Sequence, residues 1–183
     1  MKRLFVGIGL PQAIRDRLST LQSGLSGARW VAPENLHITL RFIGDVDEGM
    51  AEDIGLALEG LEAPSFTLAL EGLGAFESRG WVRSIWAGVG RSDPLAFLHA
   101  KIASALLRTE LPPDGRKFTP HITLARLKKA KGGPALSYLE THDGFAPVPF
   151  AVEHFTLFRS HLGRGGVHYE NLADYRLTPE LVQ

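Results

Sequence analysis

The feature that most constrains this chain is a tetrapeptide, HITL, that occurs twice, at positions 37–40 and 121–124. When the sequence is shifted against itself by 84 residues (121 minus 37), predicted helices align with helices and predicted strands with strands on both sides of the motif. A supersecondary unit that recurs in this way must pack against its copy to bury its apolar face. The pattern therefore predicts two similar α/β units, at about 11–90 and 95–177.

Hydrophobic periodicity divides the chain into alternating kinds of segment. Apolar and β-branched runs predict strands over 3–10, 36–44, 65–76, 83–90, 118–127, 149–158 and 167–177. Helical spacing predicts helices over 11–25, 47–61, 93–111 and 132–145. In the third helix, Asp93 is expected as the N-cap and Pro94 as the first helical residue. Residues 77–82 are expected to form a loop between two strands.

Within each motif, strand alternation places the polar side chains together. Residues i and i+2 of a strand point the same way, so His37 shares a face with Thr39, and His121 shares a face with Thr123. A single HITL would be an ordinary strand with a solvated histidine, whereas two copies at equivalent positions favour a function. If the two units pack about a pseudo-twofold axis, a cleft between them holds two histidines and two threonines.

Two imidazoles and two hydroxyls in one cleft suit displacement at phosphorus. In an in-line reaction the attacking and leaving oxygens lie on opposite sides of the phosphorus atom. One imidazole can take a proton from water while the other gives a proton to the leaving oxygen, because histidine titrates near neutral pH. Thr39 and Thr123 can donate hydrogen bonds to the non-bridging oxygens. The scheme needs no metal, and the sequence has no HExxH motif, carboxylate-rich triad or cysteine cluster.

The composition argues against several other classes of protein. Lys plus Arg and Asp plus Glu number 20 each, which argues against coating nucleic acid through bulk charge. The absence of cysteine excludes disulfides and thiolate sites. No apolar run approaches the roughly 20 residues that span a bilayer, and the opening MKRLFVGIGLPQ is not a signal peptide. A cytoplasmic setting is expected.

With these motifs in place, the chain resembles the two-histidine (2H) phosphoesterases, and within them the LigT-like RNA 2′,3′-cyclic phosphodiesterases, formerly called 2′-5′ RNA ligases. The resemblance rests on the paired H-x-T-x motifs and on the segments RLFVGIGLP, RSIWAGV, FTPHITLAR and FTLFRSHL…G…Y. It implies one bilobal α+β domain over 1–183, in which two pseudo-twofold-related units with antiparallel sheets form a central cleft. It also implies hydrolysis of a 2′,3′-cyclic phosphate, at an RNA end or in a cyclic nucleotide, to a 2′-phosphate. No metal or other cofactor, no membrane and no obligate protein partner are implied.

The resemblance also assigns roles to particular residues. It implies that His37 donates the proton to O3′ and that His121 is the base that activates water, whereas spacing alone treats both histidines alike. It suggests that Arg126 helps to hold the phosphate. Arg126 lies five residues after His121, so strict alternation would turn it toward the core unless the strand twists, bulges or ends first. A buried unpaired arginine is costly, which favours a functional position. Phe42, the equivalent residue of the first motif, is expected in the core.

Other functions and weaker signals stay open at this point. The same two histidines would serve the reverse reaction, in which a 5′-hydroxyl joins a cyclic phosphate in a 2′-5′ linkage. A non-catalytic RNA-binding module is a further alternative, although both histidines and both threonines are intact. Two basic segments also have two readings, as solvated loops or as contacts to RNA backbone. They are the run RLKKAK at 126–131, and the pair Arg79 and Arg83 around Trp81. The remaining histidines are interpreted as structural or solvated: His99, His142, His154, His161 and His168.

Overall fold

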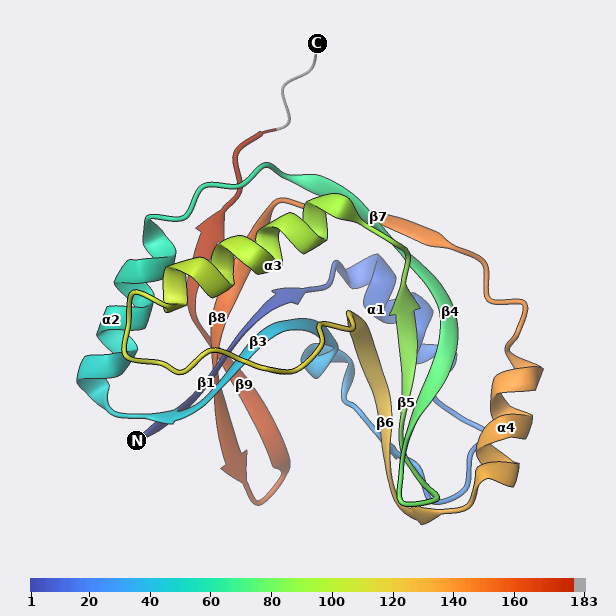
Figure 1. The fold of residues 1–183 in the computed structure, drawn as a ribbon. Helices are drawn as coiled ribbons and strands as arrows, with labels where there is room; N and C mark the ends of the chain where they lie inside the picture. Colours follow the sequence, from blue (N-terminus) through green and yellow to red (C-terminus); the bar gives the residue numbers. More distant parts are fainter. Residues whose placement is uncertain (180–183) are drawn as a thin grey trace.

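Two antiparallel sheets carry the fold, and the computed structural model describes them within residues 1–179 (Figure 1). The first sheet has the strand order β3 (His37–Val46), β1 (Lys2–Gly9), β8 (His154–Gly163) and β9 (Gly166–Arg176). The second has the order β2 (Arg29–Trp30), β6 (His121–Ala130), β5 (Trp81–Val89), β4 (Phe66–Ser78) and β7 (Val148–Val152). The predicted α+β class with two antiparallel sheets is confirmed, and each sheet forms one lobe.

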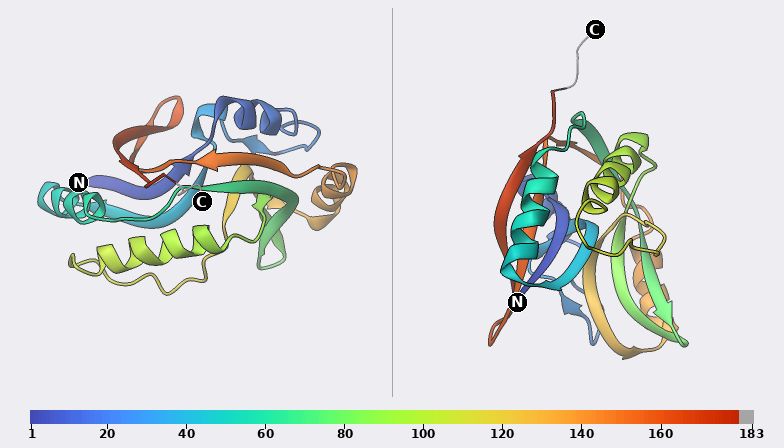
Figure 2. Two further views of the ribbon diagram at one scale, coloured as in Figure 1. Left: turned by 90° about the horizontal axis from the view of Figure 1, so that it is seen from above. Right: turned by 60° about the vertical axis from the view of Figure 1, so that its left-hand side comes forward.

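Four α-helices and one short 3₁₀ helix accompany the sheets within the described part of the chain. They are α1 (Gln12–Ser19), the 3₁₀ helix η1 (Pro33–Asn35), α2 (Glu48–Glu59), α3 (Asp93–Leu106) and α4 (Gly132–Thr141). Helix α2 contacts α3, β1 and β9, whereas α4 contacts β4 and β5. In the view from above, α1 and α3 lie on opposite sides of the molecule with strands between them (Figure 2). No helix among residues 1–179 is long and apolar enough to cross a membrane.

Helix α3 has the buried apolar stripe that its sequence predicts, but its N-cap is a different residue from the predicted one. Leu95, Leu98 and Ile102 recur at helical spacing and are almost completely buried. The N-cap is Ser92, whose hydroxyl accepts a hydrogen bond from the backbone N–H of Leu95 at 3.1 Å. Asp93 is therefore the first helical residue rather than the cap. Serine has the short side-chain oxygen that this position needs, and the acidic group of Asp93 still lies in the favourable first turn.

The first helix is shorter than its hydrophobic spacing predicts. It ends at Ser19, although Leu21 and Leu25 of the predicted range 11–25 are buried. Gly24 adopts a positive φ of 80°, a conformation outside the right-handed helix that glycine adopts at little cost. The two leucines therefore reach the core from an irregular segment. Their spacing reflects the burial of their side chains and does not indicate a longer helix.

The predicted strand over 149–158 is two strands in different sheets. β7 pairs with β4 in the second sheet and β8 pairs with β1 in the first, and the chain crosses between the sheets at Glu153. Burial favours this arrangement because Phe150 and Val152 of β7 and Phe155 of β8 all reach the core. The predicted loop over 77–82 is likewise shorter, since β4 and β5 extend to a tight turn at residues 79–80.

Each sheet combines strands from both halves of the sequence. β3 lies in one sheet with β8 and β9, whereas β6 lies in the other sheet with β4 and β5. Both motif strands pair with the strand that precedes a helix, and in both the histidine faces a glycine: Gly9 opposite His37, and Gly88 opposite His121. β3 and β6 also contact each other. The two motifs therefore occupy equivalent places in the two lobes.

Candidate active site

Both HITL strands alternate as the sequence predicts over their first four residues. Ile38 and Leu40 of β3 are buried, and Ile122 and Leu124 of β6 are completely buried. These side chains anchor each strand in the core. His37 and Thr39, and their counterparts on β6, therefore stand on the opposite, more accessible face of each sheet.

The two imidazoles are oriented by the same hydrogen bond. Nδ1 of His37 donates to the carbonyl oxygen of Asn35, and Nδ1 of His121 donates to the carbonyl oxygen of Thr119, each at 2.6 Å. A carbonyl can only accept, so Nδ1 carries a proton in both rings. Nε2 of each ring is left as the atom that can gain or lose a proton. The repeat thus extends from the motif to its anchoring carbonyls two residues upstream.

His37 lies in an aromatic setting on the face of the first sheet. The ring centre of Phe5 is 4.8 Å from that of His37, and Tyr169 presents an edge-on ring at 5.2 Å. Burial lowers the pKa of His37, and the positive charges of Arg126 and His121 lower it further. Those two groups from the second sheet therefore lie within electrostatic reach of His37.

His121 has aromatic neighbours of its own from the second sheet. Phe76 of β4 presents its ring edge-on to His121 with centres 4.8 Å apart, and Trp86 of β5 lies at 6.2 Å. Within residues 1–179, neither Nε2 of His121 nor the hydroxyl of Thr123 makes a hydrogen bond. In contrast, the hydroxyl of Thr39 lies 2.9 Å from Nε2 of His37. The two halves of the site share a plan and differ in whether the threonine hydroxyl contacts Nε2 of its histidine.

A β-bulge brings Arg126 to the histidine face. In the pairing of β5 with β6, Ile85 faces Ala125 and Trp86 faces Thr123, so Leu124 has no partner. One extra residue reverses the alternation. Ala125 is consequently buried behind Leu124, and Arg126 is exposed on the face of His121 and Thr123. A bulge is one of the alternatives that the sequence leaves open, and it removes the objection based on strict alternation.

An equivalent bulge in β3 makes the core assignment of Phe42 wrong. In the pairing of β1 with β3, Val6 faces Arg41 and Gly7 faces Thr39, so Leu40 has no partner. Phe42 follows the bulge and is 48% exposed. Its apolar character indicated a core position, whereas the bulged backbone turns it outward. Phe42 and Arg126 are thus equivalent in position and share the histidine side of their strands.

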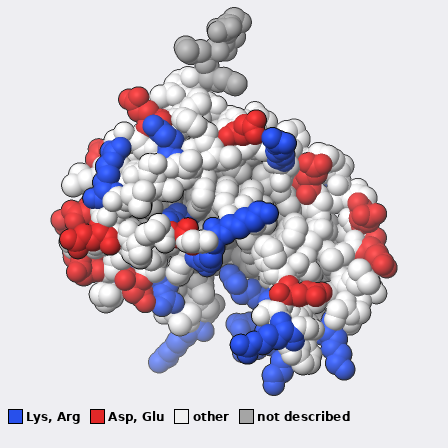
Figure 3. All heavy atoms as spheres, viewed as in Figure 1, with Lys and Arg blue, Asp and Glu red and all other residues white. Residues whose placement is uncertain are grey.

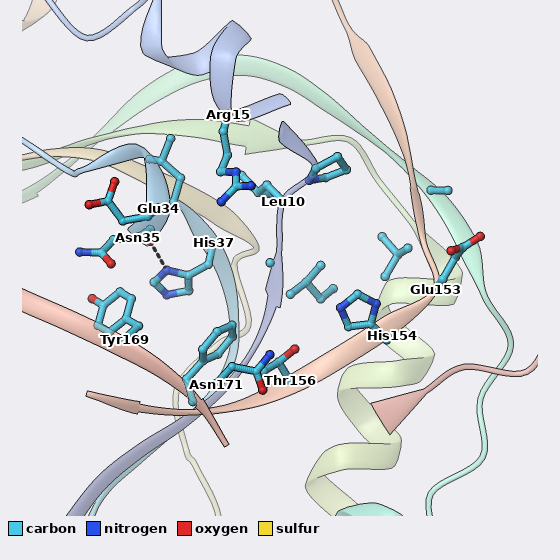
Figure 4. Close-up of a pocket in the computed structure, with 17 residues that line it drawn as sticks. Leu10, Arg15, Glu34, Asn35, His37, Glu153, His154, Thr156, Tyr169 and Asn171 are labelled. Carbon is cyan, nitrogen blue, oxygen red and sulfur yellow. Dashed lines mark hydrogen bonds between the residues drawn. The ribbon is translucent and has the colours of Figure 1, made fainter. Parts of the chain in front are cut away.

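A pocket of about 480 Å³ lies directly beside His37 (Figure 4). Arg15 extends over it from α1, Glu34 lies beside it, and Thr156 and Asn171 line the side formed by β8 and β9. The Nε atom of Arg15 is buried without a hydrogen-bond partner among the described residues. His154, interpreted from the sequence as structural or solvated, also lines this pocket.

Sequence reasoning missed the aromatic side chains around both imidazoles. Phe5, Tyr169 and Phe76 come from strands far from the motifs in sequence, and only strand pairing brings them to the histidines. Tyr169 ends one of the segments that carry the family resemblance, which was the available signal. Across residues 1–179 there is no group of three His, Cys, Asp or Glu side chains that could hold a metal ion.

Comparison with known proteins identifies the family. The model of the family described as LigT like Phosphoesterase matches residues 8–86 and again residues 89–169. The RNA 2′,3′-cyclic phosphodiesterase of Thermotoga maritima is 32% identical over 99% of this chain and 98% of its own length. The protein of the same name from Aeropyrum pernix is 37% identical over 80% of this chain and 84% of its own length.

A solved structure agrees with this result. Apo LigT from E. coli superposes with a TM-score of 0.79 at 30% identity, covering 97% of this chain and 98% of that protein. E. coli LigT has also been crystallised with 3′-AMP, and that structure matches equally well, with a TM-score of 0.79. The two-lobed arrangement is therefore the fold of these proteins. From the double family match and the full-length relatives, the chain belongs to the LigT-like phosphoesterase family.

Proposed function

We propose that this protein hydrolyses the 2′,3′-cyclic phosphate at RNA ends to a 2′-phosphate, by metal-independent acid–base catalysis with two histidines. The observation that carries the proposal is the matched pair of imidazoles, each anchored through Nδ1 to a carbonyl two residues upstream. Both rings keep Nε2 for proton transfer. Further support comes from the relatives, which are named RNA 2′,3′-cyclic phosphodiesterases.

The reaction is a single displacement at phosphorus. Nε2 of His121 takes a proton from water as the water oxygen bonds to phosphorus, and the bond from phosphorus to O3′ breaks. Nε2 of His37 gives its proton to O3′, leaving a 3′-hydroxyl and a 2′-phosphate. Thr39, Thr123 and Arg126 donate hydrogen bonds to the non-bridging oxygens, where negative charge accumulates. The assignment of donor and acceptor follows the family resemblance.

The environment of His37 places a condition on this assignment. In the free protein, burial and nearby positive charge lower its pKa, which favours the neutral ring. A proton donor must be charged. An anionic phosphodiester beside Nε2 opposes both effects and raises the pKa again, so substrate binding is accompanied by proton uptake at His37. His121, whose Nε2 makes no hydrogen bond among residues 1–179, acts as the base.

The pocket beside His37 supports a nucleotide substrate. Its volume of about 480 Å³ falls in the range of small-molecule sites. It adjoins the ring that donates to O3′, so we assign it to the terminal nucleoside. Phe158 and Tyr169 supply apolar surface for the nucleoside, and Asn171 supplies polar groups for a base edge.

The test is a hydrolysis assay with a defined product. An oligonucleotide ending in a 2′,3′-cyclic phosphate is incubated with the protein in excess EDTA, and the product isomer is identified by chromatography against 2′- and 3′-phosphate standards. We expect only the 2′-phosphate, at a rate that EDTA does not change. A 3′-phosphate product, or loss of activity in EDTA that a divalent ion restores, would refute the scheme.

Ligation of a 5′-hydroxyl to the cyclic phosphate would use the same groups in the same roles. The 5′-hydroxyl would replace water as the nucleophile, so Nε2 of His121 would take its proton while Nε2 of His37 gives a proton to the departing O3′, leaving a 3′-hydroxyl and a 2′-5′ linkage. Water is present in large excess over any 5′-hydroxyl, so hydrolysis is the expected net direction. Adding an RNA with a 5′-hydroxyl to the same assay shows whether a 2′-5′ linkage forms.

A further inference from the structure

The second sheet presents a row of four side chains on the face of His121. Register places Phe76 of β4 opposite Ser84 of β5, Ser84 opposite Arg126 of β6, and Arg126 opposite Arg29 of β2. Residues directly opposite each other in a sheet point to the same side. Since the bulge turns Arg126 to the histidine side, Arg29 and Phe76 lie on that side too. The edge-on contact of Phe76 with His121 agrees with this placement.

Within the part of the chain that the structure describes, no acidic side chain pairs with the positive charge of this row. Arg29 and Arg126 lie directly opposite on neighbouring strands, an arrangement of like charges that destabilises a sheet. Among residues 1–179, neither makes an ion pair or a side-chain hydrogen bond, and both are exposed. Uncompensated paired arginines beside a phosphoryl-transfer site fit a bound anion.

The positive charge continues away from the histidines. Beyond Arg126, β6 carries Lys128 and Lys129, and the chain continues to Lys131. In the space-filling view, Lys and Arg gather over the turn between β4 and β5, toward which this part of β6 runs (Figure 3). The protein has equal numbers of acidic and basic residues, so this concentration is local. A local basic strip is the electrostatic pattern of a polyanion site.

An exposed aromatic ring completes the row. Phe76 is 37% exposed, and its backbone position is about 14 Å from that of Arg29, three strand spacings away. An aromatic face beside cationic side chains is the arrangement that binds single-stranded nucleic acid, with bases on the ring and phosphates on the cations. A cyclic mononucleotide has no phosphate that could reach Arg29 while its own phosphate occupies the histidines.

We propose that this row is a subsite for the nucleotide on the 5′ side of the cyclic end, with Arg29 on the phosphate that links this nucleotide to the terminal one. Phe76, Arg126 and Arg29 are exposed, whereas Ser84 is buried between Phe76 and Arg126. The proposal rests on the proposed function and adds how an RNA chain, unlike a cyclic mononucleotide, is held beyond its reacting end. Phe76 stacks the neighbouring base. Arg126 lies between the reacting phosphate and this second phosphate.

The experiment compares three substrates that share one terminal nucleoside. They are a 2′,3′-cyclic mononucleotide, a dinucleotide with a cyclic phosphate end and a charged link, and the same dinucleotide with a neutral methylphosphonate link. For Arg29→Gln, we expect KM to rise about fivefold at about 0.1 M salt for the charged dinucleotide alone, and the salt slope of kcat/KM to fall by about 0.7. The other two substrates should keep their wild-type KM.

Arg108→Gln is the matched control, because Arg108 is exposed, follows α3 and makes no side-chain ion pair or hydrogen bond among the described residues. Two results would overturn the subsite. One is the same change of KM for the charged dinucleotide in Arg29→Gln and in Arg108→Gln. The other is an equal rise of KM for all three substrates in Arg29→Gln. If the wild type hydrolyses none of them, the proposed function fails. The subsite is then tested by fluorescence anisotropy, which measures the affinity for a labelled 3′-phosphorylated dinucleotide. An affinity of Arg29→Gln equal to that of the wild type would reject the subsite.

Discussion

At the scale of single residues, two identical tetrapeptides give two histidines in different states. Both rings have the same hydrogen bond at Nδ1. His37 is packed against Phe5 and Tyr169, and burial lowers its pKa, while His121 is packed against Phe76 and its Nε2 makes no hydrogen bond among the described residues. A reaction that needs one acid and one base requires two imidazoles in different surroundings, because their roles are opposite.

Removing either imidazole should abolish most of the turnover. A positioned general acid or base contributes about 10²–10⁴-fold, so His37→Ala and His121→Ala should each lower kcat by that range. The measurement is single-turnover hydrolysis, with circular dichroism to check the fold. A substrate whose leaving group departs unprotonated should rescue His37→Ala and not His121→Ala. The opposite rescue would exchange the two roles, and a near wild-type rate in either variant would contradict the mechanism.

Burial of His37 should also make the fold sensitive to acid. Its folded pKa lies below the ordinary value of 6.5, so as the pH falls through 6.5 the unfolded state binds a proton that the folded state binds less well. Its contribution to stability is therefore present above this value and lost below it. Urea unfolding at about pH 8 and about pH 5.5 should show a smaller acid loss in His37→Gln than in the wild type. An unchanged acid loss in His37→Gln would argue against this contribution, and His121→Gln is the control.

At the scale of elements, the site depends on how β1 and β3 pack. Gly7 of β1 lies opposite Thr39, next to the bulge at Leu40. A Cβ atom at Gly7 would lie 2.7 Å from the carbonyl oxygen of Ile38 and 3.5 Å from the ring of His37. The two strands approach as closely as the bulge requires only because this residue has no side chain.

Gly7→Ala should therefore lower both stability and activity. The added methyl group must push β3 and its histidine away, and overpacking of this kind costs about 1–3 kcal/mol. Gly9→Ala is the matched control, since a Cβ atom there would meet nothing within 4 Å. Chemical denaturation and steady-state kinetics on both variants provide the measurement. Equal stability of the two variants would show that the contact at Gly7 relaxes without cost.

At the scale of the whole molecule, the lobes are not the halves of the sequence. β3 of the first half completes its sheet with β8 and β9, and β6 of the second half lies beside β5. The crossing from β7 to β8 also links the two sheets. Neither half contains a complete sheet, so the strands that carry the two motif histidines depend on each other.

A fragment of residues 1–92 should therefore fail to fold alone. Its first sheet would retain only β1 and β3, and a two-stranded ribbon is marginal in water. We expect no cooperative thermal transition for the fragment by circular dichroism, and recovery of a transition when residues 93–183 are co-expressed with it. Cooperative unfolding of either fragment by itself would contradict the interdependence of the halves.

The sequence by itself determined the motif faces and the pair of histidines, because these depend on periodicity and on a repeat that periodicity makes visible. The α+β class with antiparallel sheets followed from the resemblance to a family, which the same sequence carries. Ile38 and Ile122 are buried and their polar neighbours face the other way, as alternation requires. Only the tertiary structure decided where the residues after each motif point. The bulges at Leu40 and Leu124 leave no mark on the local pattern, since they exist only in pairing with β1 and β5. They turn Phe42 and Arg126 outward, and the pairing of β2 with β6 then places Arg29 opposite Arg126. Pairing between distant strands fixes such positions, and no local window of sequence contains both partners.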